Sequence, residues 1–381
     1  MTAIHVLHSA ALLSPTSGML SQMSWEQEAA NQLGIAWQVK MYCPKNTAST
    51  FNILHHDQNV DADKLTSIFG KLTAWLKLRF NYHRWLLEQQ DFVDYFILRY
   101  YVHDPFQLWF VKKCKKPVYF VHHTLELPEL ALPGGLTSWM RSRLDQILGR
   151  RCIANAAGIV GVTQEIVEYE AARADVRDKP RYIYPNGIVF RQLDLIDERS
   201  QDVPELLFVA NFSPWHGLDL LLKSIKNSEK KFILHLVGNL PENLIPLIQD
   251  ARIKVHGSLR HDQIVYLSQR CWVGLASFAL FRKQMKQACP LKVREYLLLG
   301  LPAYGDYQDV FPSDAIYFRF GTEKIEEILD FAYAVRSLSK DDVANLARPF
   351  IDKSALLQGL YNYLQDIQCS RLPSSRHTLR P

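Results

Sequence analysis

The sequence has no run of 18 or more apolar residues, which argues against an ordinary membrane-spanning helix. Its six cysteines are scattered, with no Cys-x-x-Cys pair and no histidine at metal-ligand spacing. This pattern is typical of free thiols in a reducing cytoplasm and argues against structural zinc. A Gly-x-Gly-x-x-Gly fingerprint is absent, so dinucleotide binding of the dehydrogenase kind has no support. The first eight residues lack the basic region of a signal peptide and predict a strand, so we expect a cytoplasmic protein.

The bulk composition indicates a soluble globular protein of two domains. A chain of 381 residues is long for one hydrophobic core, and 48% hydrophobic with 22% charged residues is ordinary for globular proteins. The net charge of +5 is uneven, because residues 64–151 contain 14 Lys or Arg against 7 Asp or Glu. That segment therefore carries +7, which suggests an anionic surface or substrate for the first half.

The order of apolar strands and helical patterns predicts an α/β fold. Strand, turn, helix and strand follow one another over residues 4–42, and Gly18 lies in the turn, where it either approaches a phosphate or simply makes the turn. A second series begins after residue 191. We expect two Rossmann-like, doubly wound lobes facing across a cleft. Their bounds are residues 1–190 and 191–345, with a helix over 346–368 packing back on the first lobe and a disordered tail over 369–381.

The segment 63–89 carries a helical pattern with two interpretations. Apolar residues recur at spacings of three and four, with basic residues between them. The stripe consists of Ile68, Phe69, Leu72, Trp75, Leu76, Phe80 and Leu87. We favour a stripe that faces the core, with Arg79 and His83 among the residues on a solvated basic face. The alternative is a helix lying on an anionic membrane surface.

The stretch 287–302 predicts a loop that opens a helix at Pro290 and ends it at Gly300. Amides at the head of a helix form an anion site, and here they belong to Ala288, Cys289 and Leu291. Lys292 and Glu295 share one helix face, where they suit a phosphate and a ribose. The same two residues also fit a solvated ion pair, and the spacing alone leaves both interpretations open.

The order of five motifs resembles that of the GT-B glycosyltransferases of the retaining family 4 type. These motifs are Tyr-Pro-Asn-Gly-Ile at 184–188, Phe-Val-Ala-Asn-Phe-Ser-Pro-Trp-His-Gly at 208–217, His-Leu-Val-Gly at 235–238, Val-His-Gly at 255–257 and Pro-Leu-Lys-Val-Arg-Glu-Tyr at 290–296. The resemblance covers most of residues 1–365. It implies donor binding in the second lobe and acceptor binding in the basic first lobe.

The resemblance also implies roles for particular residues. The catalytic candidates are His123, with His122 as the adjacent alternative, Lys292, and Gln287, which stands where the family has a first glutamate that orients the sugar. Glu295 matches the second glutamate, which binds the ribose. The donor-binding candidates are Gly18, Asn211, His216, Gly217, Gly238, Gly257, Ala288, Cys289, Leu291, Lys292 and Glu295.

The expected function is transfer of a sugar from a nucleotide-sugar donor to a glycan or lipid-linked acceptor, in cell-surface polysaccharide or glycolipid synthesis. We expect no metal, no other cofactor and no nucleic acid. We do expect peripheral contact with the anionic inner face of a membrane. Because position 287 is a glutamine, an alternative is that the protein is a catalytically impaired scaffold that binds nucleotide or glycan. A nucleotide-sugar epimerase, which also uses two such lobes, is the third possibility.

Overall fold

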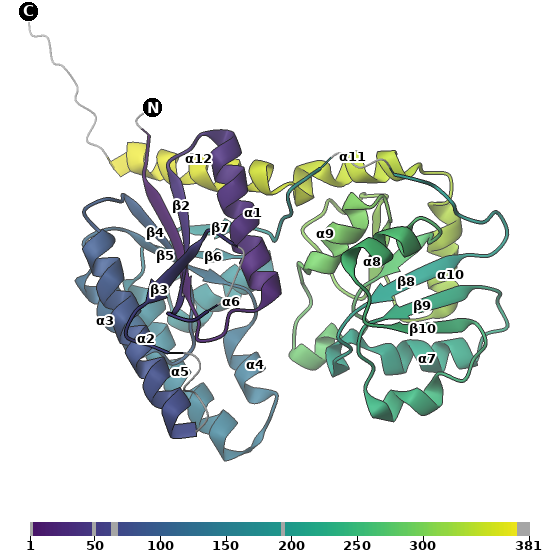
Figure 1. The fold of residues 1–381 in the computed structure, drawn as a ribbon, viewed down its shortest axis with the longest axis horizontal. Coiled ribbons are helices and arrows are strands. Elements are labelled where there is room, and N and C mark those ends of the chain that lie inside the picture. The colour runs from purple at the N-terminus through teal and green to yellow at the C-terminus, as the bar shows by residue number, and fades with distance from the viewer. Residues whose placement is uncertain (1–2, 48–50, 62–67, 192–194, 372–381) are drawn as a thin grey trace, which may run out of the picture.

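A computed structural model describes residues 3–47, 51–61, 68–191 and 195–371, and it shows two α/β lobes side by side (Figure 1). The first lobe is built on a parallel sheet of seven strands in the order β3-β2-β1-β4-β5-β6-β7. The strands are β1 (Val6–Ala11), β2 (Trp37–Pro44), β3 (Leu54–Asp57), β4 (Tyr95–Arg99), β5 (Val118–His122), β6 (Gly158–Gly161) and β7 (Arg181–Ile183). Because β1 pairs with both β2 and β4, the order reverses beside β1. Such a reversal opens a crevice at the carboxyl ends of the strands.

Helices cover both faces of the first sheet. One face packs on α1 (Ser17–Leu33) and on α12 (Lys353–Arg371), through apolar side chains such as Met23, Leu357 and Leu360. The other face packs on α2 (Ile68–Gln89), α3 (Pro105–Lys113), α5 (Gly135–Asn155) and α6 (Gln164–Ala174), while α4 (Glu126–Ala131) follows β5. The result is the three-layer arrangement expected from the strand-helix order.

The helix α2 is rotated relative to the expectation from its pattern. Phe69, Leu72, Leu76 and Phe80 are exposed, and Phe69 is 83% exposed. The inward face carries Leu78, Tyr82 and Leu86, together with Arg79 and His83. The favoured orientation was therefore wrong. Arg79 pairs with Asp104 across 2.6 Å, and this fully buried pair fixes the helix with its polar groups inside.

The second lobe repeats the design with six parallel strands in the order β10-β9-β8-β11-β12-β13. They are β8 (Glu205–Val209), β9 (Ile233–Val237), β10 (Ile253–Gly257), β11 (Val273–Leu275), β12 (Ala303–Gly305) and β13 (Phe318–Phe320). The helices are α7 (Leu218–Lys226), α8 (His261–Ser268), α9 (Leu291–Leu298), α10 (Ile325–Ala334) and α11 (Lys340–Ile351). Short 3-10 turns occur as η2 (Pro214–His216), η3 (Glu242–Leu247) and η4 (Leu280–Lys283).

The chain crosses between the lobes twice, and the two crossings are bonded to each other. The Ile188 amide donates to the Ile351 carbonyl and the Lys353 amide donates to the Ile188 carbonyl, both at 2.8 Å. Beyond this point α12 lies against α1 on the first lobe (Figure 1). The expected tail over 369–381 begins within this helix, and its residues 372–381 lie outside the described chain. Within the described ranges, no helix combines the length and apolarity needed to cross a bilayer.

Candidate functional site

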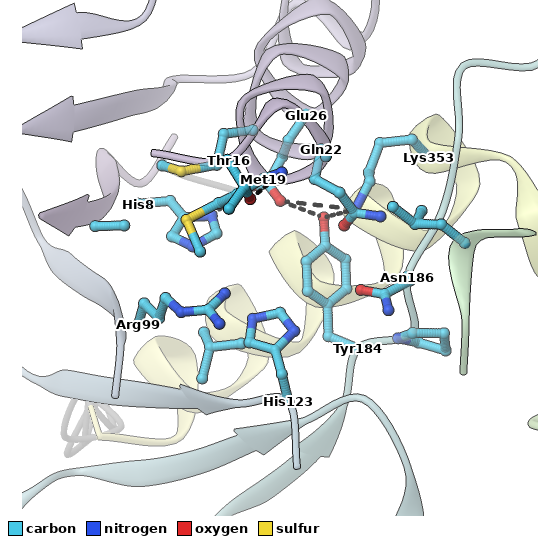
Figure 2. A pocket seen from close by; sticks show the side chains of 16 residues that line it. His8, Thr16, Met19, Gln22, Glu26, Arg99, His123, Tyr184, Asn186 and Lys353 are labelled. Atoms are coloured by element: carbon cyan, nitrogen blue, oxygen red, sulfur yellow. Dashed lines mark hydrogen bonds and ion pairs between the residues drawn. The ribbon is translucent and has the colours of Figure 1, made fainter. Parts of the chain in front are cut away.

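A cavity of about 290 Å³ lies at the carboxyl edge of the first sheet (Figure 2). Its walls come from β1, the first turns of α1, the ends of β4 and β5, and the turn after β7. Leu291 at the start of α9 and Lys353 at the start of α12 complete it. Gly18 lines this cavity from the first turn of α1, and a side chain built there would meet nothing within 4 Å.

A buried carboxylate, Glu26, organises one wall of the cavity. It accepts hydrogen bonds from His8 Nδ1 (2.5 Å) and from Trp37 Nε1 (2.8 Å). It also accepts from the Tyr184 hydroxyl (2.8 Å), and Lys353 Nζ lies 3.9 Å away (Figure 2). Burial alone would raise the pKa of Glu26, but the charges and hydrogen bonds of its partners outweigh burial and lower that pKa to about 2. The carboxylate is therefore ionised at neutral pH. Its contacts with Tyr184 and Lys353 join α1 to the turn after β7 and to α12.

Two nitrogen-bearing side chains face the cavity from neighbouring strands. Arg99 ends β4 and His123 follows β5, and because these strands are parallel neighbours their carboxyl ends meet at one edge. Figure 2 shows the two side chains next to each other below His8, with the Arg99 guanidinium extending toward the His123 ring. Burial, followed by the nearby Arg99, lowers the pKa of His123 well below its ordinary value, so this ring is a neutral hydrogen-bonding group. The adjacent His122 turns away into the core, where it stacks on Tyr100.

Lys292 lies in the first turn of α9, next to the cavity residue Leu291. The Nζ atom is buried and has no hydrogen-bond partner among the described residues, and it lies 5.1 Å from the centre of the Phe208 ring. Burial lowers the pKa of Lys292 to about 7. A buried amine without a partner is costly, and such groups concentrate at functional sites.

The His216 ring lies near two lysines, Lys292 and Lys283. Burial, together with the charges of Lys292 and Lys283, lowers the pKa of His216 to about 3. The Ser213 amide donates to His216 Nδ1 at 2.9 Å, so the neutral ring carries its proton on Nε2, which can act as a donor. Lys283 lies over the Trp215 ring and 3.6 Å from Glu129 of the first lobe, so it bridges the lobes.

The predicted donor loops lie together at the carboxyl edge of the second sheet. Asn211, Gly238 and Gly257 follow or end the neighbouring strands β8, β9 and β10, and the Gly238 amide donates to the Gly257 carbonyl at 2.7 Å. Gly238 has a φ of 119°, and a side chain there would lie 1.9 Å from the Ala210 carbonyl oxygen. Gly217 has a φ of 68° and abuts the Phe278 backbone. Both positions therefore require glycine.

The loop before α9 is held by the interlobe turn. The Asn186 side chain donates to the Cys289 carbonyl (2.6 Å), and the Asn186 amide donates to Cys289 Sγ (3.1 Å). The Ala288 amide donates to the Gln308 carbonyl (3.1 Å), so this amide is not free to bind an anion as expected. The first amides of α9, at Leu291 and Lys292, lack intrahelical acceptors by their position.

Gln287 makes a different contact from the one its motif position implies. Its Oε1 accepts from the Glu165 amide in the first turn of α6 (2.9 Å), and the Glu165 carboxylate accepts from the Gln287 amide (2.8 Å). Gln287 thus joins the two lobes and does not line the cavity that holds His123. Glu295 lies one turn after Lys292 and near His261, and burial raises the pKa of its carboxyl.

Comparison with solved structures places this arrangement among known folds. The lipopolysaccharide outer core galactosyltransferase WaaB in its apo form has a TM-score of 0.66 and 12% identity, covering 96% of this chain and 100% of that one. HepE from Anabaena, solved with UDP and glucose, has a TM-score of 0.60 and 12% identity, covering 95% and 100%. The chain has the GT-B fold. A UDP-GlcNAc 2-epimerase from Methanocaldococcus jannaschii is also similar, with a TM-score of 0.52 and 12% identity, covering 95% and 100%. No protein-family profile and no curated protein sequence matches the chain.

Several residues of this GT-B arrangement were missed from sequence. Arg99 carried a usable signal, because it ends a buried strand in the same way that His123 follows one. Glu26 and Lys353 were missed although the helix over 346–368 was expected to return to the first lobe, because no local pattern pairs two particular residues more than 300 positions apart. Lys283 is separated from Lys292 by a loop whose path has no periodic pattern.

Proposed function

We propose that this protein is a glycosyltransferase that moves a sugar from a nucleoside-diphosphate sugar to an acceptor hydroxyl. The observation that carries the proposal is the buried Nζ of Lys292 in the first turn of α9, which has no hydrogen-bond partner in the described part of the chain. A diphosphate supplies the missing partner, and charge-assisted hydrogen bonds of this kind are worth about 1.5–3 kcal/mol each. HepE, of the same fold, was solved with UDP and with UDP-glucose, which supports a nucleotide-sugar donor.

The proposed roles follow from the charge that develops during transfer. The bond from the anomeric carbon to the donor phosphate breaks and its electron pair goes to the diphosphate. Lys292, the Nε2–H of His216 and the first amides of α9 stabilise that charge, while Glu295 accepts the ribose hydroxyls. The sugar and the acceptor occupy the cavity beside His123 and Arg99. By family resemblance we propose retention of configuration without a metal, with the departing phosphate accepting the acceptor's proton.

The test is a thermal-shift screen of UDP-, GDP- and ADP-linked sugars, followed by transfer assays with Lys292→Ala. A ligand at 100 times its dissociation constant adds about 2.7 kcal/mol of stability. The variant should lose tenfold or more in kcat/KM, because one lost charge-assisted bond exceeds 1.36 kcal/mol. The proposal is wrong if no nucleotide raises the melting temperature, or if the variant retains activity within threefold of the natural protein.

An epimerase is the second candidate, supported by the structural similarity to the archaeal 2-epimerase. It would interconvert free donor sugars without an acceptor, which proton NMR of the donor pool detects directly. Nucleotide binding without either reaction would instead favour an inactive scaffold.

A further inference from the structure

The outward face of α5 is apolar, which is the reverse of an ordinary surface helix. Leu136, Trp139, Met140, Leu144 and Ile147 are all exposed, and Leu136 is 72% exposed. They recur at spacings of three and four residues, so they form one stripe along the helix.

The orientation of α5 is fixed by polar contacts on its inward face. Asp145 is fully buried and accepts from the Tyr100 hydroxyl (2.7 Å) and from Arg173 (2.9 Å), and its buried neighbours on the helix are Ser138 and Gly149. Rotating the helix to hide the apolar stripe would break these bonds and bury arginines. The stripe is therefore a surface that the fold presents outward.

Basic side chains lie within and beside this stripe. Arg143 and Arg151 continue the same helical face, and Arg143 lies over the Trp139 ring at 5.8 Å. Arg141 and Arg150 flank it, and Arg150 pairs with Asp175 at 3.6 Å. The only carboxylate on α5 is the buried Asp145. The exposed charge of α5 itself is thus entirely positive.

The neighbouring helices extend the surface. α3 packs against both α2 and α5, and Phe80 of α2 contacts the rings of Phe106 and Trp109 on α3. The exposed apolar residues of α2 alternate with Lys71 and Lys77, and Lys112 and Lys113 end α3. We call the outward side of α2, α3 and α5 the basic apolar face.

We propose that the basic apolar face docks on a lipid bilayer that carries anionic headgroups. Aromatic and aliphatic side chains enter the interface between headgroups and acyl chains, while Arg and Lys bind the headgroup phosphates. A second copy of the chain would bring like charges together, and a nucleic-acid phosphate backbone offers nothing to exposed leucines. This docking goes beyond the proposed transfer reaction and does not depend on it.

The experiment is co-sedimentation of the full chain with phosphatidylcholine vesicles, with and without phosphatidylglycerol. One variant, Arg143→Glu/Arg151→Glu, reverses two charges of the face, and its control, Lys223→Glu/Lys226→Glu, makes the same charge change on exposed α7 residues of the second lobe. A second variant, Leu136→Ser/Ile147→Ser, is matched by Ile245→Ser/Leu346→Ser, which removes exposed aliphatic residues elsewhere.

We expect the natural protein to bind the vesicles that contain phosphatidylglycerol and not the vesicles of phosphatidylcholine alone. The charge variant should bind at least tenfold more weakly, because each cation near an anionic surface contributes about fivefold. The apolar variant should also lose at least tenfold, and both controls should bind like the natural protein. The proposal is overturned if the natural protein binds neither kind of vesicle, or if the control variants lose as much binding as the variants of the face. It is also overturned if the natural protein is a dimer that binds no vesicles and the apolar variant is a monomer.

Discussion

Replacing Lys292 with methionine should raise the stability of the protein at neutral pH. The amine makes no hydrogen bond that would be lost among the described residues, and methionine fills a similar volume. Burial lowers the pKa of Lys292 from an ordinary 10.5 to about 7, so the unfolded chain binds more protons than the folded one between these values. Stability contributed by this group therefore rises with pH across that window.

The magnitude follows from the two pKa values. With an unfolded pKa near 10.5 and a folded pKa near 7, the penalty is about 4 kcal/mol at pH 7 and about 2 kcal/mol at pH 9. The natural protein should therefore gain about 2 kcal/mol between pH 7 and pH 9 relative to Lys292→Met. Contributions from all other titrating groups cancel in this difference. The contact between Lys292 and Phe208 offsets about 0.5–1 kcal/mol of the gain in the variant, without changing the sign of the pH effect.

Urea unfolding at both pH values, with and without a nucleoside diphosphate, measures these quantities. The matched control is Lys340→Met, another buried lysine of the second lobe, whose Nζ donates to the Ser268 carbonyl at 2.9 Å. Burial lowers the pKa of Lys340 as well, to about 8, so Lys340→Met also relieves a penalty. That relief is smaller and is offset by the Ser268 carbonyl that loses its donor, so the control should gain less stability at pH 7 than Lys292→Met. The nucleotide should stabilise the control as it does the natural protein, and should stabilise the Lys292 variant less, by about 1.4 kcal/mol for each tenfold loss of affinity. A destabilised Lys292→Met with unchanged nucleotide binding would refute the reasoning.

Three further outcomes are expected. Binding of UDP at pH 8 should take up nearly one proton, because a diphosphate restores the charge of Lys292; calorimetry in buffers of different ionisation enthalpy measures this, and zero uptake contradicts it. Glu26→Gln should lower the unfolding free energy by about 3 kcal/mol at pH 7. The difference in stability between the natural protein and the variant should shrink as the pH falls toward the Glu26 pKa of about 2. A difference that stays constant in urea titrations at low pH would disprove this. Gln287→Glu should change kcat/KM by less than threefold, since the side chain faces α6; a tenfold gain would show that it turns to the sugar.

The fold could be predicted because its signals are local and repeated. Each buried strand is a short apolar run, and helical patterns separate the strands, which leaves few arrangements other than a parallel sheet. The orientation of α2 could not be predicted in this way, because the helix has two apolar stripes. Its direction is decided by the buried pair of Arg79 and Asp104, which are 25 residues apart.

The candidate site could be predicted in part for the same reason. Lys292 and the glycines lie in short motifs where strand ends and helix starts coincide, so their positions follow from local order. The contact made by Gln287 could not be read from its motif, because its partner Glu165 belongs to the other lobe. The Glu26 wall of the cavity likewise combines residues from α1, β1, the turn after β7 and α12.

The pKa values at the site explain why Lys292 and His216 can lie near each other although neither has an ion-pair partner among the described residues. Burial lowers the pKa of Lys292 to about 7 and of His216 to about 3, so at neutral pH His216 is neutral and Lys292 is only about half protonated, which limits the repulsion between them. A bound diphosphate would raise the pKa of Lys292 again, since a nearby anion favours the protonated amine. Proton uptake and binding would then be one event, and affinity should fall about tenfold for each pH unit above the pKa of that lysine. This coupling distinguishes a site made for an anion from a lysine buried for packing, because the latter would keep its depressed pKa whether or not nucleotide is added.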